Sequence, residues 1–168
     1  MANMVKNTTL LIIFAVVLIL LITFRKPINM ALSRGLRNNN PGNIRLTFDI
    51  KGKKTFWTGE VEGKDKDFKT FNTLEFGYRA MFVTLNSYLK KGVNTIEKII
   101  NRYAPAEDNN NVISYINTVT SISGLESNKI ISNDVQLKKI IKGMSFVENG
   151  VNADEEKILK GYQLYLIT

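Results

Sequence analysis

Carboxyl groups are the main candidates for acid–base chemistry in this chain, because its sequence contains neither histidine nor cysteine. Without cysteine there is no thiolate nucleophile, no thiolate metal ligand and no disulfide. Without histidine the commonest general base and metal ligand are also missing. We therefore expect no metal site and no cofactor, and any catalysis must rest on carboxyl, hydroxyl, amide or lysine groups.

Glu148 is the carboxyl group whose position best suits a general acid. It continues the apolar stripe of Leu137 and Met144 on a predicted helix, and Gly150 follows as the expected helix end. Partial burial and the negative end of the helix dipole both raise a carboxyl pKa, and a general acid must be protonated near neutral pH. The alternative is a solvated glutamate at a frayed helix end.

Three other glutamates are weaker candidates. Glu75 lies three residues after Asn72 in a capping-box pattern, where the helix dipole lowers its pKa and makes it a good cap but a poor acid. It stays a second catalytic candidate. Glu60 and Glu62 fall in a loop after Trp57, where they face either a cleft or only water. Trp57 itself either stacks on a sugar face or lies in the core.

The chain has a formal net charge of +8, which suits a polyanionic partner or simply aids solubility. The polyanions that this charge fits are nucleic acid, anionic lipid and a cell-wall polymer. We do not expect nucleic acid, because no Lys/Arg run is longer than two residues and no aromatic–basic motif of a known module is present.

The N-terminal segment has the pattern of a membrane anchor. After a short polar N-terminus of residues 1–7, the run of residues 8–24 contains no charged residue, and Lys6 and Arg25 flank it. About 17 apolar residues are at the short end of a bilayer span. A cleaved signal peptide fits less well, because positive charge follows at once and no Ala-x-Ala site does. The pattern predicts a single-pass membrane protein with the lipid bilayer as partner through residues 8–24; its orientation stays open.

A linker of residues 25–33 precedes a domain of residues 34–168 that reads as mainly α with a small antiparallel β-sheet, an α+β fold. Dense turn chemistry at residues 38–43 leads into three β-prone runs, Ile44–Phe48, Lys54–Trp57 and Asp67–Phe71, with the acidic loop between the last two. Apolar residues at helical spacing then predict five helices. These run from about Leu74 to Gly92, from Asn94–Glu97 to Pro105, from about Val112 to Gly124, from Asn133 past Met144, and from Asn152 through Leu164.

A series of short motifs between residues 33 and 150 is specific enough to suggest a family. The motifs are Arg34-Gly35-Leu36-Arg37-Asn38-Asn39-Asn40-Pro41-Gly42-Asn43-Ile44-Arg45, Trp57-x-Gly59, Phe68-x-x-Phe71, Gly77-Tyr78-Arg79-Ala80, Leu85-x-x-Tyr88, Tyr103-Ala104-Pro105 and Glu148-Asn149-Gly150. Together they resemble a family of phage-encoded, virion-associated, peptidoglycan-degrading lysins that are described as lysozyme-like or lytic-transglycosylase-like. The lysin of the enveloped double-stranded RNA phages is similar.

The resemblance implies a lysozyme-like domain with a cleft between a helical lobe and a small sheet. It implies cleavage of peptidoglycan between N-acetylmuramic acid and N-acetylglucosamine during entry or lysis. The protein would then sit in the virion internal membrane or the host inner membrane, with other virion or capsid proteins as partners. Lytic transglycosylases place one catalytic Glu at a helix end in a Glu-Ser-Gly-x-Asn-Pro-like setting. Residues 148–153 are similar, with Ala153 in place of Pro.

The order of these motifs differs from the order found in lytic transglycosylases. In ordinary lytic transglycosylases the catalytic Glu precedes the sheet, whereas here the Asn-Asn-Pro segment does. Either Glu148 returns to that place from the C-terminal side, as in a circular permutation, or Glu75 or a glutamate of the sheet loop is the acid. A muramidase, which needs a second carboxylate, also stays open.

The resemblance also suggests residues that bind substrate. Asn39, Asn40 and Asn43 could hydrogen-bond N-acetyl and hydroxyl groups or could only shape their turn. Arg79 could hold the substrate or another carboxylate, and Tyr103 begins a stretch similar to the late Tyr-containing motif of the family. The alternative to an enzyme is a non-catalytic virion membrane protein that retains the fold for cell-wall binding or assembly.

Overall fold

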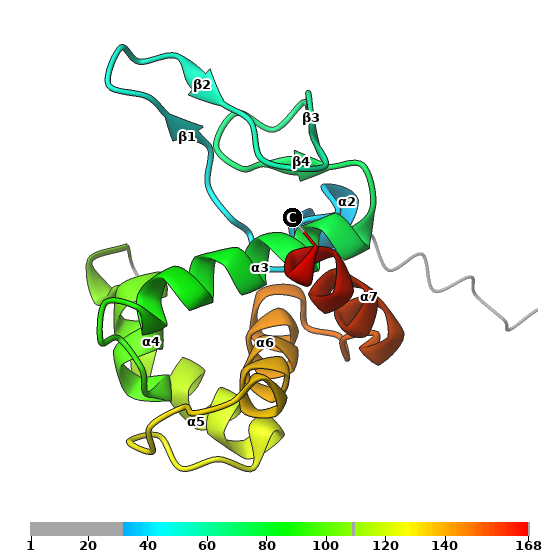
Figure 1. Ribbon diagram of the computed structural model, residues 1–168. Coiled ribbons are helices and arrows are strands. Elements are labelled where there is room, and N and C mark those ends of the chain that lie inside the picture. Colours follow the sequence, from blue (N-terminus) through cyan, green and yellow to red (C-terminus); the bar gives the residue numbers. More distant parts are fainter. Residues whose placement is uncertain (1–31, 109, 168) are drawn as a thin grey trace, which may run out of the picture. The chain divides into compact units, whose positions relative to one another are not determined.

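The computed structural model describes residues 32–108 and 110–167. The chain divides into two compact units, Met1–Ala31 and Leu32–Thr168, and all described residues belong to the second. This unit contains the predicted domain of residues 34–168 and is mainly helical, with two small antiparallel sheets near its start (Figure 1).

The predicted membrane anchor is corrected by the structure. Within residues 32–108 and 110–167, no helix combines the length and apolarity needed to cross a bilayer, and the predicted span of residues 8–24 lies outside this described part. A single-pass membrane protein, and a fold class that includes a transmembrane helix, are therefore not supported. The apolar residues of the described helices recur at helical spacing between polar ones, which suits burial against neighbouring helices rather than in lipid.

Six α-helices and one short 3₁₀ helix form most of the described unit (Figure 1). They are α2 (Arg34–Arg37), α3 (Leu74–Leu89), α4 (Ile96–Tyr103), the 3₁₀ helix Ala106–Asp108, α5 (Val112–Ser123), α6 (Asp134–Asn149) and α7 (Glu155–Leu166). Helix α7 packs along α3, and α5 packs along α6. The five longer helices confirm the positions predicted from the apolar spacing.

The helix ends follow the predicted capping chemistry only in part. The N-cap of α3 is Thr73, whose side chain makes no cap hydrogen bond, rather than the predicted Asn72, and α7 is capped by Asp154. Asn133 caps α6 by accepting a hydrogen bond from the backbone N–H of Gln136, as predicted. Thr95, rather than Asn94, caps α4. Helix α6 ends at Gly150, whose φ of 70° is in the left-handed region that glycine adopts most readily. The helix end that carries Glu148 is therefore fixed by local sequence.

The strands differ from the single sheet that was predicted. β1 (Thr47–Phe48) pairs with β2 (Lys54–Thr55), and β3 (Glu60–Val61) pairs with β4 (Thr70–Phe71) in a separate sheet. The segment that contains Glu60 was predicted to be a loop and instead forms β3. The prediction failed because strands of two residues are too short to show an alternating pattern.

The hydrophobic core lies between α3 and the helices packed on it. Its fully buried side chains include Tyr78, Met81, Phe82, Leu85, Ile99, Ile100, Ile140, Ile141 and Met144. Gly161 allows α7 to approach α3 closely, because a Cβ at this position would lie 2.6 Å from the Cβ of Tyr78. The result is a closely packed helical lobe that includes α6.

Candidate active site

The turn of residues 38–43 is the first element of the site. Asn39 and Asn43 adopt left-handed conformations, with φ of 48° and 47°, which asparagine tolerates better than most residues. Asn40 is fully buried, and its carboxamide bonds the backbone N–H and C=O of Ile44 and the carbonyl of Lys69, each at 2.9 Å. Asn40 therefore ties this turn to the segment that leads into β4.

The end of α6 meets this turn at Glu148. Asn43 donates a hydrogen bond from Nδ2 to Glu148 Oε2 at 2.8 Å, and the Tyr115 hydroxyl of α5 donates to Oε1 at 2.8 Å. Asn43 and Glu148 are 105 residues apart in the sequence. Folding thus brings the C-terminal glutamate to the Asn-Asn-Pro segment, which is the arrangement that a permuted order of motifs requires.

The environment of Glu148 favours its protonated form. Burial raises the pKa of this carboxyl above its usual value, and the hydrogen bonds from Asn43 and Tyr115 and the charge of Arg34 only partly oppose that rise. Burial, together with the charge of Glu148, also raises the pKa of Tyr103 and of Tyr115 well above 10. Both phenols therefore remain neutral donors at physiological pH.

Two further contacts hold the turn in place. The Tyr103 hydroxyl donates to the carbonyl oxygen of Gly42. Asn149, the last residue of α6, accepts a hydrogen bond from the Ser33 hydroxyl at 2.6 Å and donates to the carbonyl of Pro41 at 2.8 Å. The position of Asn43 relative to Glu148 is therefore fixed from α4 and from α6.

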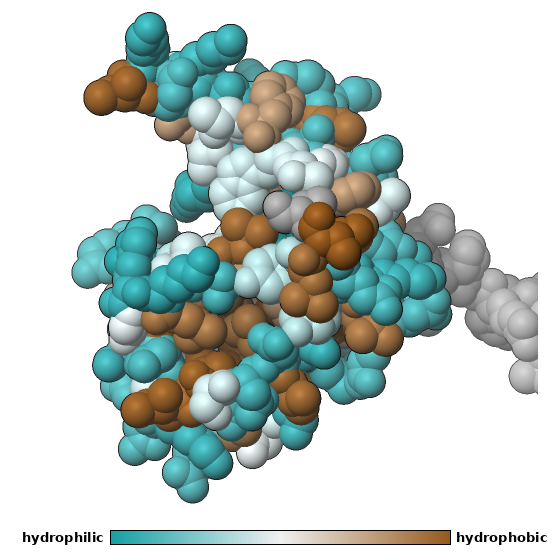
Figure 2. Space-filling view, viewed as in Figure 1, coloured by the Kyte–Doolittle hydropathy of each residue, from teal (hydrophilic) through white to brown (hydrophobic). Residues whose placement is uncertain are grey.

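A groove of about 290 Å³ adjoins this cluster on the side of Asn43 and Tyr103. In Figure 2 the surface is hollowed where the strands meet the helical lobe. The lining residues are Asn43, Ile44, Arg45, Leu46, Thr47, Trp57, Thr84, Tyr88 and Tyr103. Three aromatic side chains among polar groups and a cation are a suitable surface for a sugar that carries hydroxyl and N-acetyl groups.

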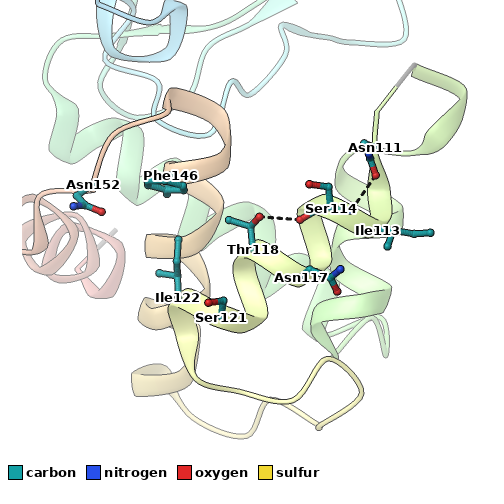
Figure 3. Close-up of a pocket in the computed structure, with 9 residues that line it drawn as sticks. All are labelled: Asn111, Ile113, Ser114, Asn117, Thr118, Ser121, Ile122, Phe146 and Asn152. Atoms are coloured by element: carbon teal, nitrogen blue, oxygen red, sulfur yellow. Dashed lines mark hydrogen bonds between the residues drawn. The ribbon is translucent and has the colours of Figure 1, made fainter.

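A larger groove of about 640 Å³ lies on the outer face of α5 and reaches Phe146 and Asn152 (Figure 3). Its lining is uncharged and rich in amide and hydroxyl groups: Asn111, Ile113, Ser114, Asn117, Thr118, Ser121, Ile122, Phe146 and Asn152. None of the groups bonded to the Glu148 carboxylate lines it. The smaller groove contains Asn43, which bonds Glu148, although Glu148 itself lines neither groove.

Glu75, the second catalytic candidate, is held as an anion. The Lys157 ammonium lies 2.6 Å from Glu75 Oε1, and this bond, together with one from Thr73, lowers the pKa of Glu75 to about 2. A carboxyl with this pKa carries no proton to donate near neutral pH. Its partners lie in α7 and at the start of α3, and it shares none of the partners of Glu148.

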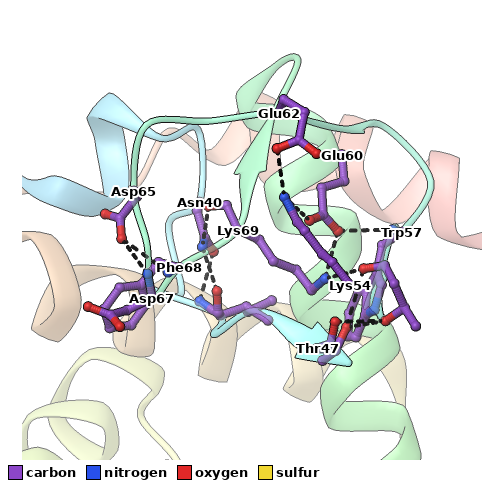
Figure 4. Close-up of polar contacts among 12 residues, drawn as sticks. Asn40, Thr47, Lys54, Trp57, Glu60, Glu62, Asp65, Asp67, Phe68 and Lys69 are labelled. Atoms are coloured by element: carbon purple, nitrogen blue, oxygen red, sulfur yellow. Dashed lines mark hydrogen bonds and ion pairs between the residues drawn. The ribbon is translucent and has the colours of Figure 1, made fainter. Parts of the chain in front are cut away.

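Glu60 and Glu62 also form ion pairs with lysines (Figure 4). The side chains of Glu60 and Lys69 are both fully buried and form an ion pair of 2.6 Å. Glu60 also accepts a hydrogen bond from the backbone N–H of Trp57, and Lys69 lies 5.1 Å above the Trp57 ring. Glu62 is exposed and pairs with Lys54 at 3.2 Å. These contacts position the Trp57 side chain at the groove.

The structure separates the predicted substrate-binding residues into two sets. Asn43 and Tyr103 line the groove, whereas Asn40 is buried and Asn39 bonds the carbonyls of Phe71 and Asn72 at 3.0 and 3.2 Å. Arg79 is buried within α3 and is not among the residues that line the groove.

Sequence reasoning left Tyr115 out of the site, although it lies in the stretch that resembles the Tyr-containing motif. Its contact to Glu148 joins residues 33 positions apart on two helices, which local spacing does not reveal. In the described part of the chain, no group of three or more acidic side chains could hold a metal ion.

No family model matches the sequence. The chain is 39% identical over 143 residues to "Protein P5" of Pseudoalteromonas phage PM2, and the match spans 83% of this chain and 86% of that protein. The chain therefore belongs to the family of this phage protein.

Proposed function

We propose that this relative of a phage protein is a peptidoglycan-degrading enzyme that cleaves the glycan strand between N-acetylmuramic acid and N-acetylglucosamine. It would act as a virion lytic transglycosylase in entry or lysis. The observation that carries the proposal is Glu148: a carboxyl with a raised pKa, bonded to Tyr115 and to Asn43, and Asn43 in turn lines the groove.

In the first step, protonated Glu148 gives its proton to the glycosidic oxygen as the bond from this oxygen to C1 of N-acetylmuramic acid breaks. A raised pKa increases the fraction of Glu148 that carries the proton at a given pH. The hydrogen bonds from Asn43 and Tyr115 then stabilise the carboxylate that forms. The two bonds also fix the carboxyl orientation, which limits the entropy lost in reaching the transition state.

In the second step, the Glu148 carboxylate removes the proton from the C6 hydroxyl of the same N-acetylmuramic acid residue. The freed O6 forms a bond to C1, which gives a 1,6-anhydro sugar and restores protonated Glu148. One group thus acts as acid and then as base, and no water is consumed.

A single-carboxylate mechanism fits the remaining acids better than hydrolysis. A retaining or inverting hydrolase needs a second free carboxylate. Glu60 and Glu75 each form a close ion pair with a lysine. Asp108 pairs at 3.5 Å with the groove residue Arg45 and is a remaining candidate for that second carboxylate. Its removal is therefore the test of a hydrolytic alternative.

The alternative is a non-catalytic virion protein that keeps the fold for wall binding or assembly. One observation favours it: both oxygens of Glu148 are hydrogen-bonded within the protein, which also suits a glutamate that only links α5 and α6 to the turn. This reading predicts wall binding without product release.

The test is digestion of purified peptidoglycan by the full-length chain, with mass spectrometry of the soluble products. We expect 1,6-anhydro-muropeptides from wild type, loss of at least about 100-fold in Glu148→Gln, and near-normal rates in Asp108→Asn. The matched control is Glu156→Gln, which changes an exposed glutamate at the start of α7. Reducing-end products with loss in Asp108→Asn would instead mean a hydrolase. Wall binding without any product would support the structural alternative.

A further inference from the structure

The side-chain amide of Asn43 has one satisfied end and one unsatisfied end. Its Nδ2 donates to Glu148 Oε2 at 2.8 Å, while its Oδ1 is buried and has no hydrogen-bond partner in the described part of the chain. A buried acceptor without a partner typically costs about 1–3 kcal/mol. Such an atom beside the candidate acid calls for a physical explanation.

The surroundings of Oδ1 make its orientation unfavourable. It faces Gly35 of α2, and three oxygens lie within 3.2 Å of the point that a Cβ on Gly35 would occupy: Asn43 Oδ1, the carbonyl oxygen of Asn40 and Asn149 Oδ1. The Asn40 carbonyl and Asn149 Oδ1 each accept one hydrogen bond, from the Asn43 backbone N–H and the Ser33 hydroxyl. Asn43 Oδ1 therefore faces the same point as two other oxygens, each of which can accept one more hydrogen bond.

The reversed amide would remove this mismatch. A half-turn about the last side-chain bond of Asn43 keeps the same shape, places Nδ2 toward the Asn40 and Asn149 oxygens, and places Oδ1 against Glu148. Oδ1 can bond Glu148 only if the carboxyl carries a proton to donate. Each orientation of the amide thus suits one protonation state of the acid.

We propose that the side-chain amide of Asn43 reverses its orientation when Glu148 gains or loses its proton. It donates from Nδ2 to the carboxylate and accepts at Oδ1 from the protonated acid. Asn43 is then a positioning residue that holds the acid in the same place before and after it gives up its proton. The proposal deepens the proposed function and rests on it, because only a group that loses and regains a proton needs a partner of this kind.

The other polar groups that face Glu148 cannot fill this role alone. The Tyr115 hydroxyl donates to Oε1, and Tyr103 donates to the Gly42 carbonyl. Arg34 acts through its charge, which favours only the carboxylate. The amide of Asn43 is the contact on Oε2, the oxygen that Tyr115 leaves available for the proton.

The test is an NMR titration of the full-length protein, which requires no turnover. In wild type, through-space contacts from the Asn43 amide protons to the Gly35 Hα should appear as the Glu148 carboxyl carbon reports protonation and disappear as the pH rises. The same contacts at every pH, or at none, would overturn the proposal. Absence of activity with the contacts present would defeat only the proposed function.

Asn43→Gly gives a second, independent readout, because glycine accepts the φ of 47° at this position. If Asn43 only donated, it would stabilise the Glu148 carboxylate alone. Its loss would then raise the Glu148 pKa by about one unit or more. An amide that serves both states loses one hydrogen bond in each, so we expect a shift below about half a unit. A shift of a full unit overturns the proposal. The control is Asn39→Gly, at the other left-handed position of the turn, with the same Glu148 titration as wild type.

Discussion

Asn149 donates a hydrogen bond of 2.8 Å from Nδ2 to the carbonyl oxygen of Pro41, which joins two segments 108 residues apart. The same side chain accepts from the Ser33 hydroxyl at 2.6 Å. The residue that follows Glu148 therefore fixes the turn from which Asn43 reaches Glu148. The site depends on this connection, because neither the turn nor the helix end alone sets the distance between acid and partner.

Replacement of Asn149 by alanine should damage both stability and activity. It removes two long-range hydrogen bonds, and we expect a loss of about 1–3 kcal/mol in urea unfolding. The turn would then move relative to Glu148, and a misplacement of about 1 Å costs on the order of 100-fold in rate. The matched control is Asn101→Ala on the exposed side of α4, where the amide bonds only a carbonyl of its own helix. Equal effects of the two variants would argue against a role in positioning.

Glu148→Gln should stabilise the protein at neutral and higher pH. Because the folded-state pKa of Glu148 is raised, the folded protein binds the proton more tightly than the unfolded chain, and stability falls as the pH rises through this pKa. Glutamine stays neutral at every pH, so the difference between variant and wild type should be small below about pH 4 and grow above it. The check is thermal unfolding at a series of pH values; a constant difference would mean that the carboxyl is not perturbed.

Glu75→Gln should have the opposite effect and destabilise the protein at neutral pH. The pKa of Glu75 is lowered to about 2, so the ion pair with Lys157 stabilises the fold above the ordinary value of 4.5 and is lost as the pH falls toward 2. We expect the variant to lose roughly 1–2 kcal/mol at pH 7 and to approach wild type near pH 2. Urea unfolding measured across this range tests the window. Peptidoglycan release should remain, which separates Glu75 from Glu148.

The sequence predicts the helices well because their signals are local. Asn133 and Gly150 mark the two ends of α6, and the apolar spacing between them places Glu148 on the inner face. The contacts of Glu148 are not local: Tyr115 and Asn43 lie 33 and 105 residues away. No spacing rule connects them, and the resemblance to lysins supplied only the expectation that these segments meet.

The strand segments and the apolar N-terminal run carry weaker local signals than the helices. Glu60 was predicted in a loop after Trp57, facing either a cleft or only water, yet its side chain is fully buried against Lys69. Such pairing is a tertiary property that composition does not show. The run of residues 8–24 satisfies a hydropathy rule at its lower limit of length. It lies outside the described residues, among which no helix is long and apolar enough to cross a membrane.

The buried pair of Glu60 and Lys69 yields the last prediction. Lys69 also donates to the carbonyl of Thr55 at 3.1 Å, so it connects β4 to the β1–β2 hairpin, while Glu60 holds the backbone N–H of Trp57 (Figure 4). Lys69→Met would leave the buried carboxylate with Lys54 alone, at 3.7 Å, and should cost about 3–5 kcal/mol. Glu60→Gln should cost a similar amount because the ammonium then lacks a counter-charge.

The double variant distinguishes a charge pair from two separate packing roles. If the cost of each single variant comes from the charge left behind, Glu60→Gln with Lys69→Met should lose less than the sum of the two, by about 2 kcal/mol or more. Urea unfolding of all four proteins gives this coupling, and the emission of Trp57, the single tryptophan, reports the hairpin at the same time. Strict additivity would show that the pair does not hold the Trp57 side of the groove through its charges.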